Sequence, residues 1–348
     1  MRRPFLLSLL TTALVVALPL QAQDLDATTR AALEAAAVEA LQSHYIFPDR
    51  VKDLRARLAA ERARLDAAAD APAYAQALGG LLGEVTRDRH VRVVHSPQAL
   101  PAEVAVSAPS PDAQRQLYRM LNQGVSKVER LPGNLGYLDL RAFTSRDTAK
   151  PKLDAALTLL ADTEALIIDL RHNGGGQPET VAYLASFFVK PGTHLTDMVW
   201  RTPQGEEVQS FYAEAVGLQY DKPVWLLMSP RSFSGAEGFA YELQQLKRAQ
   251  VAGQTSGGGA HPGGMHRIGT HFSLFVPNGR ARNPHSGTNW EGVGVQPDLP
   301  VPAADDALRV VQLRLLDELA PKARDPRQLR GLEARMKELR EAAPKPLP

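Results

Sequence analysis

The chain has 348 residues, of which 44% are hydrophobic and 22% charged, and it contains no cysteine. This length suffices for one large or two smaller hydrophobic cores, and the lack of cysteine excludes disulfides as a source of stability. The 40 basic residues exceed the 38 acidic ones only by Arg2 and Arg3, so the rest of the chain is balanced. We therefore expect no nucleic-acid partner, because such proteins carry a clustered basic surface.

The N-terminal segment 1–22 combines two arginines with an apolar run from Leu6 to Leu20 and ends at Ala22. This order of regions is typical of a secretory signal peptide, and the apolar run is too short for a comfortable membrane span. We expect cleavage near Ala22, a periplasmic or secreted mature protein, and no stable membrane insertion after signal removal. A single N-terminal anchor is the alternative interpretation.

Segment 23–88 is predicted to form a small N-terminal helical domain. From Leu25 to about Val85 the chain is rich in Ala, Leu, Arg and Glu, with apolar residues at helical spacing. Interruptions at Pro48 and at Asp66–Pro72 divide this pattern into three helices, so we expect a three-helix bundle.

Two further segments are predicted to contribute little to a core. Segment 89–133 is expected to be a junction and linker, because Ser96–Asp112 is rich in Pro, Ser and Ala. Segment 321–348 is highly charged and ends in a proline-containing tail, which predicts a solvated helix followed by a frayed end.

Segment 134–320 is predicted to be an α/β domain, because short apolar runs alternate with helical patterns. The expected strands are Leu135–Leu140, Ala165–Leu170 and Pro223–Met228, and the expected helices are Thr148–Ala161, Glu179–Val189, Glu237–Leu246 and Asp305–Leu316. Such alternation indicates βαβ units around a largely parallel sheet. Ligand sites in these sheets lie at the carboxyl ends of strands, where the loops after Leu170 and Met228 are found.

Ser234 lies between the predicted strand Pro223–Met228 and the predicted helix Glu237–Leu246. A serine at such a turn projects its hydroxyl beside N–H groups of the helix N-terminus, which can face an anion. Attack of a serine on a carbonyl develops an oxyanion that needs such donors, so Ser234 is a candidate nucleophile. The competing interpretation is a helix cap, with Glu237 as partner in an S-x-x-E capping box.

Three glycines, Gly174 to Gly176, follow the predicted strand Ala165–Leu170. They let the backbone turn sharply and bring N–H groups close to a bound group, which favours an oxyanion hole. The spacing matches neither of the phosphate-binding patterns G-x-x-x-x-G-K and G-x-G-x-x-G. An ordinary flexible turn is the alternative. His172, beside these glycines, is a candidate substrate-binding residue.

A serine hydroxyl near its free pKa is a weak nucleophile and needs a base. His90 lies where the helical pattern changes to an alternating one, and His261 and His266 flank the glycine-rich loop 257–264, so all three are candidates. An ordinary solvated histidine is the competing interpretation of His90.

A carboxylate can hold such a histidine in the right tautomer and stabilise its cation. Glu291 and Asp298 both qualify chemically. We expect no metal site and no cofactor, because the histidines are scattered, cysteine is absent and no H-E-x-x-H pattern occurs.

Together these residues resemble the tail-specific (C-terminal-processing) serine peptidase superfamily, in its branch of tricorn-type proteases and interphotoreceptor retinoid-binding-protein-like modules. The resemblance rests on a strand followed by Asp-Leu-Arg-x-Asn-x-Gly-Gly, a Ser-x-x-Glu after a strand, and a closing Gly-Val-x-Pro-Asp. It covers about residues 28–302. The segments that resemble this branch in particular are Tyr45–Pro48, Gly257–Pro262 and Asn289–Gly292.

The resemblance implies an α/β catalytic domain of the crotonase/ClpP-like superfold, preceded by a three-helix domain. It also implies Ser234 as the nucleophile, and an oxyanion hole made by the N–H of Gly235 with that of Gly174 or Gly175. The lysine base of better-known tail-specific proteases is missing, because residues 255–259 contain none. The tricorn-like arrangement is therefore the better match.

In that arrangement His90 is the base and Glu291 the supporting carboxylate. Tricorn-type enzymes place a serine just before the histidine, whereas this chain has Arg89. The third member of the triad is therefore left open between Glu291 and Asp88.

The 40 residues between His90 and Leu131 are too few for a PDZ domain, which many relatives use to grip the C-terminus of a substrate. We therefore expect no PDZ domain and substrate selection by the cleft. Loop 257–264 would cover this cleft, with Gly258 and His261 contacting the substrate.

The sequence thus predicts an exported serine-type peptidase that acts on a peptide or protein substrate, and it leaves the oligomeric state open. The alternative is a non-catalytic protein on the same fold that binds an apolar ligand such as a retinoid or fatty acid. An esterase of the α/β-hydrolase type is disfavoured, because the sequence around Ser234 lacks the G-x-S-x-G pattern.

Overall fold

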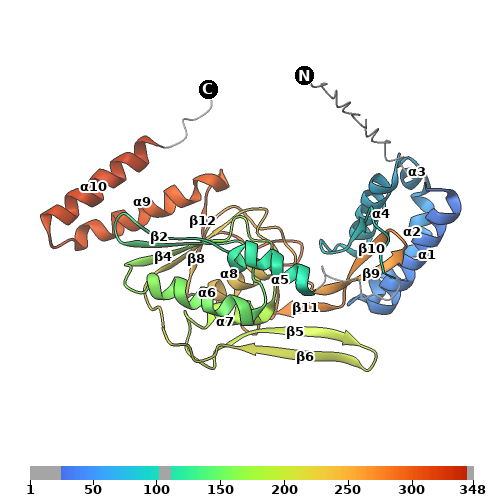
Figure 1. Ribbon diagram of the computed structural model, residues 1–348, viewed down its shortest axis with the longest axis horizontal. Coiled ribbons are helices and arrows are strands. Elements are labelled where there is room, and N and C mark those ends of the chain that lie inside the picture. Colours follow the sequence, from blue (N-terminus) through green and yellow to red (C-terminus); the bar gives the residue numbers. More distant parts are fainter. Residues whose placement is uncertain (1–24, 102–110, 343–348) are drawn as a thin grey trace, which may run out of the picture.

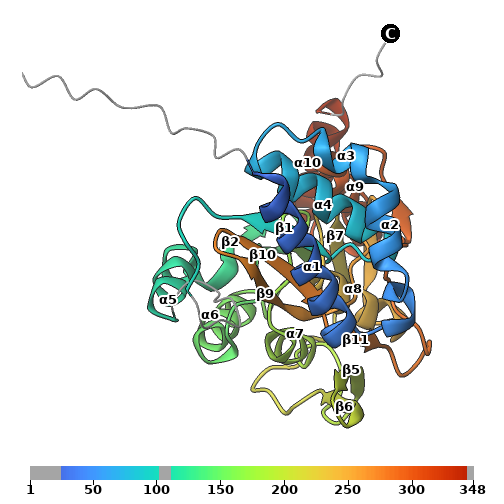
Figure 2. The ribbon, with the colours of Figure 1, turned by 90° about the vertical axis from the view of Figure 1, so that its right-hand side faces the viewer.

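A computed structural model describes residues 25–101 and 111–342 in two lobes (Figure 1). The N-terminal lobe comprises residues 25–101 together with the hairpin 263–277, and the α/β lobe comprises the other described residues. Figure 2 shows the helices of the N-terminal lobe in front of the α/β lobe. The predicted signal peptide 1–22 lies outside the described residues. Among these residues no helix combines the length and the apolar character needed to cross a bilayer.

A six-stranded sheet forms the centre of the α/β lobe. Its order is β12-β8-β7-β4-β3-β2, and all neighbours are parallel except β2 and β3. The strands are β2 Val125–Leu131, β3 Leu135–Leu140, β4 Ala165–Asp169, β7 Val224–Met228, β8 Gln250–Gly253 and β12 Leu299–Pro300. The predicted α/β class and largely parallel sheet are confirmed, and every residue of β3, β4 and β7 is buried, as expected of strands covered on both faces.

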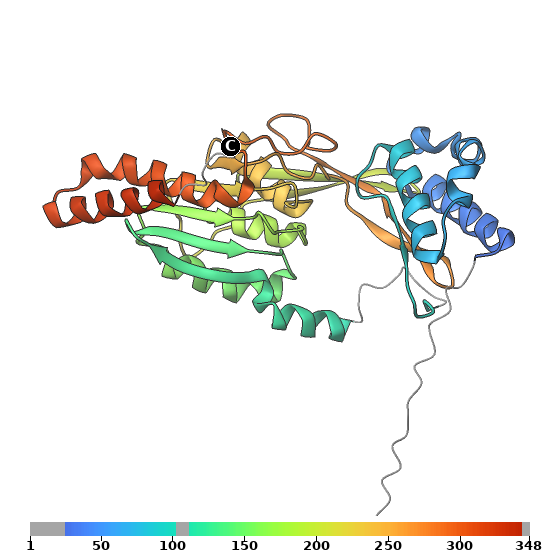
Figure 3. The same ribbon diagram turned by 90° about the horizontal axis from the view of Figure 1, so that it is seen from above.

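Helices cover both faces of this sheet (Figure 3). One face carries α6 Arg146–Leu159, α7 Pro178–Ala185 and α8 Gly235–Gln245, and the other carries α9 Ala307–Leu319, with α10 Pro326–Glu341 packed on α9. The sequence predicted a solvated helix beyond Pro321, which is wrong for one face of α10. Leu332, Met336 and Leu339 are buried there against α9, which hides an apolar stripe within a highly charged sequence.

The N-terminal lobe contains more than the predicted three helices. Its helices are α1 Ala27–His44, η1 Pro48–Val51, α2 Leu54–Ala60, α3 Arg62–Asp66 and α4 Ala71–Thr86. The middle predicted helix is divided at Glu61, which joins α2 to α3. A three-stranded antiparallel sheet of β1 Arg92–His95, β10 Phe272–Pro277 and β9 Gly263–Gly269 completes the lobe.

The hairpin β9–β10 therefore comes from the range 134–320 but shares its core with the N-terminal helices. Phe272, Leu274 and Val276 are buried in the same cluster as Leu41 and Leu78. Two chain segments more than 170 residues apart thus build one lobe, as the pairing of Val93 with Leu274 shows. This arrangement fixes the position of the segment that follows α4.

A second three-stranded sheet forms a ribbon below the α/β lobe in Figure 1. It consists of β5 His194–Thr202, β6 Gly205–Tyr212 and β11 Gly279–Arg282. The remaining elements are α5 Pro111–Met120, η2 Asn122–Gly124, η3 Ala304–Asp306 and η4 Ala320–Lys322. The predicted linker Ser96–Asp112 lies partly outside the described residues, and the absence of a PDZ domain stays a prediction.

Candidate active site

Ser234 holds a strained backbone conformation between β7 and α8. Its φ of 54° and ψ of −118° lie in a region that glycine adopts readily and other residues rarely do. Such strain costs about 1–3 kcal/mol and persists only where the surrounding structure enforces it, typically at functional sites. A strained serine on a sharp strand-to-helix turn is the geometry that exposes a nucleophilic hydroxyl, although the flanking glycine pattern of α/β-hydrolases is absent here.

Glu237, in the first turn of α8, holds this turn against the glycine-rich loop 257–264. Its side chain is fully buried and accepts hydrogen bonds from the N–H of Ser234 (2.7 Å), Gly258 (2.6 Å) and Gly259 (2.9 Å). The hydroxyl of Ser256 donates a fourth. Burial raises the pKa of Glu237, and the four hydrogen bonds oppose that shift. The sequence suggested only its bond to Ser234, as in a capping box; its contacts with the loop could not be read from the sequence.

The loop Gly174–Gly176 lies directly against the Ser234 turn. A side chain at Gly175 would place its Cβ 2.6 Å from the Gly235 N and 2.8 Å from the Ser234 Cβ, so only glycine allows this approach. Gly175 also has a φ of 99°. The predicted donor role of Gly175 needs correction, because its N–H already donates to the Asn173 Oδ1 (2.8 Å). Within the described residues, the N–H groups of Gly174 and Gly235 donate to no acceptor.

His90 reaches this region from the N-terminal lobe. Helix α4 ends at Thr86, and the left-handed φ of 52° at the next residue, Arg87, redirects the chain, so that Asp88 and His90 enter the space between the lobes. His90 is only 5% exposed. The centroid of its ring lies 4.6 Å from that of Phe233, the residue before Ser234. Among the described residues, no hydrogen bond joins the Ser234 hydroxyl to a histidine.

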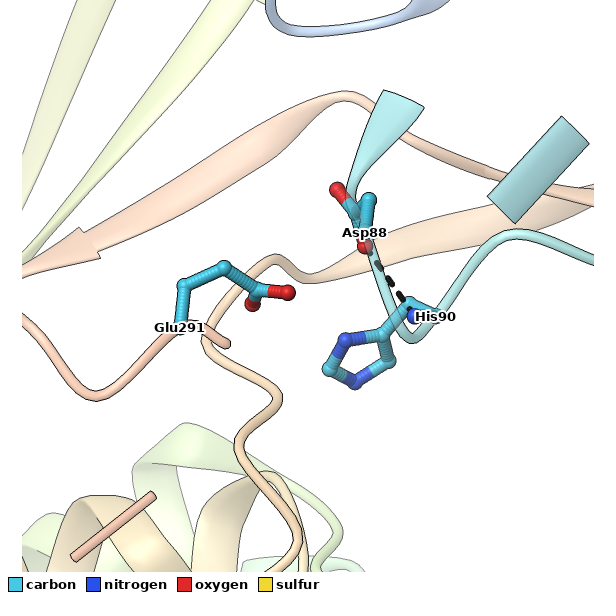
Figure 4. Close-up of side chains that lie close together, drawn as sticks. All are labelled: Asp88, His90 and Glu291. Carbon is cyan, nitrogen blue, oxygen red and sulfur yellow. Dashed lines mark hydrogen bonds between the residues drawn. The ribbon is translucent and has the colours of Figure 1, made fainter. Parts of the chain in front are cut away.

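The two nitrogens of the His90 ring have different surroundings. Figure 4 shows one nitrogen turned toward Asp88 and Glu291 and the other on the opposite side of the ring. The Nδ1 is buried and has no hydrogen-bond partner within the described residues. Burial lowers the pKa of His90 to about 4, against the opposing effect of Asp88. The ring is therefore neutral at physiological pH, as a general base must be.

Asp88 and Glu291 lie beside His90, together with His261. The Nδ1 of His261 is 2.6 Å from the Asp88 Oδ2 and 3.4 Å from the Glu291 Oε2. Asp88 also accepts hydrogen bonds from the His90 N–H (3.0 Å) and the Tyr45 hydroxyl (3.0 Å). Glu291 accepts hydrogen bonds from the backbone N–H of Arg89 and Ala260. Both carboxylates thus lie close to His90, the candidate base.

These two carboxyl groups differ in their titration. Burial disfavours the charge of Asp88, but hydrogen bonding and attraction from His261 outweigh it and hold the pKa of Asp88 below its usual value. Burial dominates at Glu291 and raises its pKa, despite the attraction of His261. The same surroundings therefore favour a charged Asp88 more strongly than a charged Glu291.

The other candidate residues occupy different places. His172 is exposed on the loop after β4. His261 is only 3% exposed and is held by Asp88, so its predicted contact with substrate needs correction: it lies beneath the surface and supports the carboxylates. Asp298 lies elsewhere and accepts from the N–H of Val251, and His266 stacks on His44.

The segments that carried the resemblance interlock around this cluster. The Trp290 Nε1 donates to the Gly259 carbonyl (2.7 Å), and the Gly292 N–H donates to the Gly258 carbonyl (3.0 Å). Tyr45 bonds to Asp88, and the Phe47 ring lies edge-on to His261 at 5.2 Å. Gly258, with a φ of 83° and its N–H donated to Glu237, is thus a structural part of loop 257–264, and its predicted contact with substrate stays a prediction.

Comparisons with known proteins identify the domain that carries Ser234. Residues 134–301 match the family model described as Peptidase family S41. Over these residues the chain is similar to the S41 peptidases. The match confirms the resemblance to tail-specific serine peptidases, whereas the tricorn-like branch stays a prediction.

One relative of this chain is a carboxy-terminal-processing protease of Bartonella bacilliformis, which is 29% identical over 178 residues. The matched segment covers 49% of this chain and only 40% of that relative.

Solved structures show the same fold at low sequence identity. Mature CPAF has a TM-score of 0.58 at 14% identity, and the match covers 89% of this chain and 96% of that one. A candidate peptidase from Parabacteroides merdae ATCC 43184 has a TM-score of 0.56 at 18% identity, with coverages of 78% and 89%. The chain therefore shares the fold of these structures over most of its length.

Proposed function

We propose that this protein is an exported serine-type peptidase with Ser234 as nucleophile and His90 as general base. The observation that carries the proposal is the strained Ser234 turn. It packs against Gly174–Gly176, and Phe233, the residue before Ser234, contacts the ring of His90, a neutral and buried histidine. The match of residues 134–301 to a peptidase family model supports the reaction class. The substrate is a peptide or protein, and no cofactor takes part.

In the proposed reaction His90 accepts the Ser234 proton at Nε2 while the Ser234 Oγ attacks the scissile carbonyl carbon. The N–H groups of Gly174 and Gly235 stabilise the oxyanion of the tetrahedral intermediate. The intermediate collapses to an acyl-enzyme as His90 returns the proton to the leaving amine. Water, deprotonated by His90, then hydrolyses the acyl-enzyme. Because Ser234 and His90 belong to different lobes, their hydrogen bond forms when the lobes close on substrate.

Glu291 is proposed as the carboxylate that supports His90. It lies on the side of the ring where Nδ1 has no partner, and it retains an open position after its backbone hydrogen bonds. Asp88 is already engaged by His90 N–H, Tyr45 and His261, so it orients the backbone of the base and fixes His261. Glu291 therefore suits the imidazolium partner better than Asp88 does.

Labelling with a fluorophosphonate tests the nucleophile, because the reagent modifies only an activated serine. Stoichiometric labelling of the mature protein, located at Ser234 by peptide mass spectrometry and lost in Ser234→Ala, is the expected result. Folded protein that stays unlabelled would instead support the alternative function, binding of an apolar ligand. Stoichiometric retention of a retinoid or fatty acid would then be the next measurement.

Export is proposed from the pattern of residues 1–22, which has the charge and hydropathy of a signal peptide. Expression of the full chain in a Gram-negative host with N-terminal sequencing tests it. A mature N-terminus near Ala22 in the periplasmic fraction is expected, and an intact N-terminus in the cytoplasm contradicts the proposal.

A further inference from the structure

Three side chains beside the proposed catalytic base have the composition of a metal-binding site. One carboxylate oxygen each from Asp88 and Glu291 and one ring nitrogen of His90 lie within 4.8 Å of one another (Figure 4). The two lobes thus contribute to a single cluster, since Glu291 follows the last strand of the ribbon sheet and the other two follow α4.

The Nδ1 of His90 is an independent indication of a missing ligand. The side chain is 95% buried, because its exposure is 5%, and this nitrogen has no hydrogen-bond partner within the described residues. A buried polar atom without a partner is costly and calls for an explanation such as a bound ion. Figure 4 shows that this edge of the ring is the one turned toward the two carboxylates.

The charge balance of the cluster also favours a cation. Asp88 and Glu291 share this volume with the imidazole of His261, which lies 2.6 Å from one and 3.4 Å from the other. A single imidazole balances at most one carboxylate. The guanidinium of the adjacent Arg89 donates to the Gly257 carbonyl (2.6 Å) rather than to either carboxylate.

We propose that Asp88, His90 and Glu291 bind a divalent transition-metal ion, with Zn²⁺ as the best match, and that this ion reversibly inhibits the peptidase. One imidazole and two carboxylates suit zinc, with water as the fourth ligand. Tetrahedral zinc holds its ligand atoms about 3.4 Å apart, so the side chains close by little more than about 1 Å. The inhibitory consequence rests on the proposed function, whereas the metal site does not.

Partners around the cluster already orient the carboxylates for this role. Asp88 is held by the Tyr45 hydroxyl and by His261, and Glu291 is held by the N–H of Arg89 and Ala260. Such outer contacts fix the direction in which a ligating carboxylate points and contribute to metal affinity. Within the Tyr45–Pro48 segment, Tyr45 thus orients the carboxylate of Asp88.

A path from solvent to the cluster exists. A groove of about 1500 Å³ runs along α4 and β1, and Asp88, Arg89 and Gly292 line it. The groove therefore reaches Asp88, one of the three proposed ligands, and ends beside Gly292, the residue after Glu291. An ion can therefore enter without separation of the lobes.

Inhibition follows from the tautomer that the metal selects. An imidazole that binds a metal through Nδ1 uses the lone pair of that nitrogen, so its proton resides on Nε2. A protonated Nε2 cannot accept the proton of Ser234, and the serine stays unactivated. Removal of the ion restores the tautomer in which Nδ1–H faces Glu291 and Nε2 is free.

Calorimetric titration of chelator-treated, tag-free protein with ZnCl₂ tests the site directly. The expected result is one Zn²⁺ per chain, with affinity reduced at least about 10-fold in His90→Ala and in Glu291→Gln. The matched control is His194→Ala. His194 also lies beside a carboxylate, Asp197 at 2.8 Å, but outside the proposed site, so its removal should leave the affinity for Zn²⁺ unchanged. Thermal unfolding establishes that each variant is folded.

Absence of saturable binding, or equal affinity in the folded Glu291→Gln and His90→Ala variants, overturns the site. Zn²⁺ should also raise the unfolding temperature of the parent protein but not of Glu291→Gln.

Fluorophosphonate labelling of Ser234 with and without Zn²⁺ tests the inhibition separately. We expect labelling to be blocked by Zn²⁺ and restored by EDTA. Labelling that proceeds equally in both conditions, in protein shown to bind Zn²⁺, overturns the inhibitory role. If Ser234 is never labelled, even in EDTA, the proposed peptidase function fails, while the titration still decides the metal site.

Discussion

At the scale of single residues, the backbone of Ser234 indicates a position selected for exposure of its hydroxyl rather than for stability. Its φ of 54° and ψ of −118° suit glycine. A serine retained in this conformation costs stability that the surrounding contacts must offset, and Glu237 supplies one such contact through the Ser234 N–H.

Ser234→Ala and Ser234→Gly therefore separate strain from chemistry. Both should lower turnover by about 10⁴-fold or more, because both lack the proposed nucleophile. Ser234→Gly should be about 1 kcal/mol more stable than Ser234→Ala, since relief of the strained φ exceeds the extra entropy of the unfolded glycine chain. Denaturant unfolding of the two variants measures this difference, and equal stabilities would show that the turn is not strained.

Glu237 joins the nucleophile turn to loop 257–264, so its substitution should affect both. In Glu237→Gln the amide nitrogen replaces one acceptor oxygen and faces N–H donors, which costs about 2–4 kcal/mol of stability. We also expect faster amide exchange at Gly258 and Gly259. Gln245→Glu, an exchange of the same two residue types at the last residue of α8, is the control. Unchanged amide exchange at Gly258 and Gly259 contradicts the interpretation that Glu237 holds the Ser234 turn against loop 257–264.

At the scale of elements, two glycine-rich loops are brought to the start of α8, and Gly175 sets how closely one of them approaches. Its φ of 99°, and the 2.6 Å that would separate an added Cβ from the Gly235 N, leave no room for a side chain. Gly175→Ala should lower Ser234 labelling by about 10²–10³-fold, because the proposed oxyanion donors move apart. Gly217→Ala, at an exposed glycine with no heavy atom within 4 Å of the added Cβ, should leave labelling unchanged.

Helix α8 also carries a buried carboxyl group, Glu242, which makes stability depend on pH. Its Oε2 has no hydrogen-bond partner within the described residues, and burial alone raises its pKa from 4.5 to about 8. The folded protein therefore keeps a proton that the unfolded chain releases. The stability that the folded protein gains by keeping Glu242 neutral is fully present below pH 4.5 and is lost progressively as the pH rises to about 8.

Glu242→Gln cannot ionise and should remove this pH dependence. We expect the variant to exceed the parent protein in stability by a few kcal/mol at pH 9 and by much less at pH 5. Thermal unfolding across this range measures the difference. A stability difference that is the same at both pH values shows that Glu242 is not held neutral by burial.

At the scale of the whole molecule, local sequence patterns predicted the elements of the α/β lobe but not the composition of the N-terminal lobe. The strand Leu135–Leu140 agrees with β3 residue for residue, since a short apolar run between helical patterns has few other interpretations. The hairpin β9–β10 was not predicted. Its partners lie in α1 and β1, and such distant pairing leaves no local signal.

The residues of the candidate site likewise divide into those that local sequence patterns indicate and those that depend on distant contacts. Ser234 and the glycines next to it became candidates because strand, turn and helix are consecutive in the sequence. The burial of His261 and its bond to Asp88 depend on contacts across 173 positions of the chain, so the sequence suggested a surface role instead. Loop 257–264 has many glycines but is fixed by Glu237, a constraint that composition cannot reveal.

The junction between the two lobes positions the segment that carries His90, and Arg201 on β5 contributes to it. Its guanidinium donates to the Tyr45 carbonyl (2.6 Å) and the Gln42 carbonyl (3.3 Å), which belong to the end of α1. Both acceptors are at a helix C-terminus, where carbonyl groups otherwise lack intrahelical partners. Phe47, two residues after Tyr45, contacts His261. The hydrogen bonds of Arg201 therefore lie close to the proposed base.

Arg201→Ala should therefore loosen the junction of the lobes without altering the Ser234 turn. We expect faster amide exchange over residues 42–47 and a lower kcat/KM, whereas the folded α/β lobe keeps its exchange protection. Arg280→Ala is the matched control, because Arg280 lies on the same ribbon but pairs with exposed Glu206 at 3.1 Å. If both variants show parent-like exchange and kcat/KM, the position of His90 is maintained by the shared core of β9, β10 and the N-terminal helices rather than by the hydrogen bonds of Arg201.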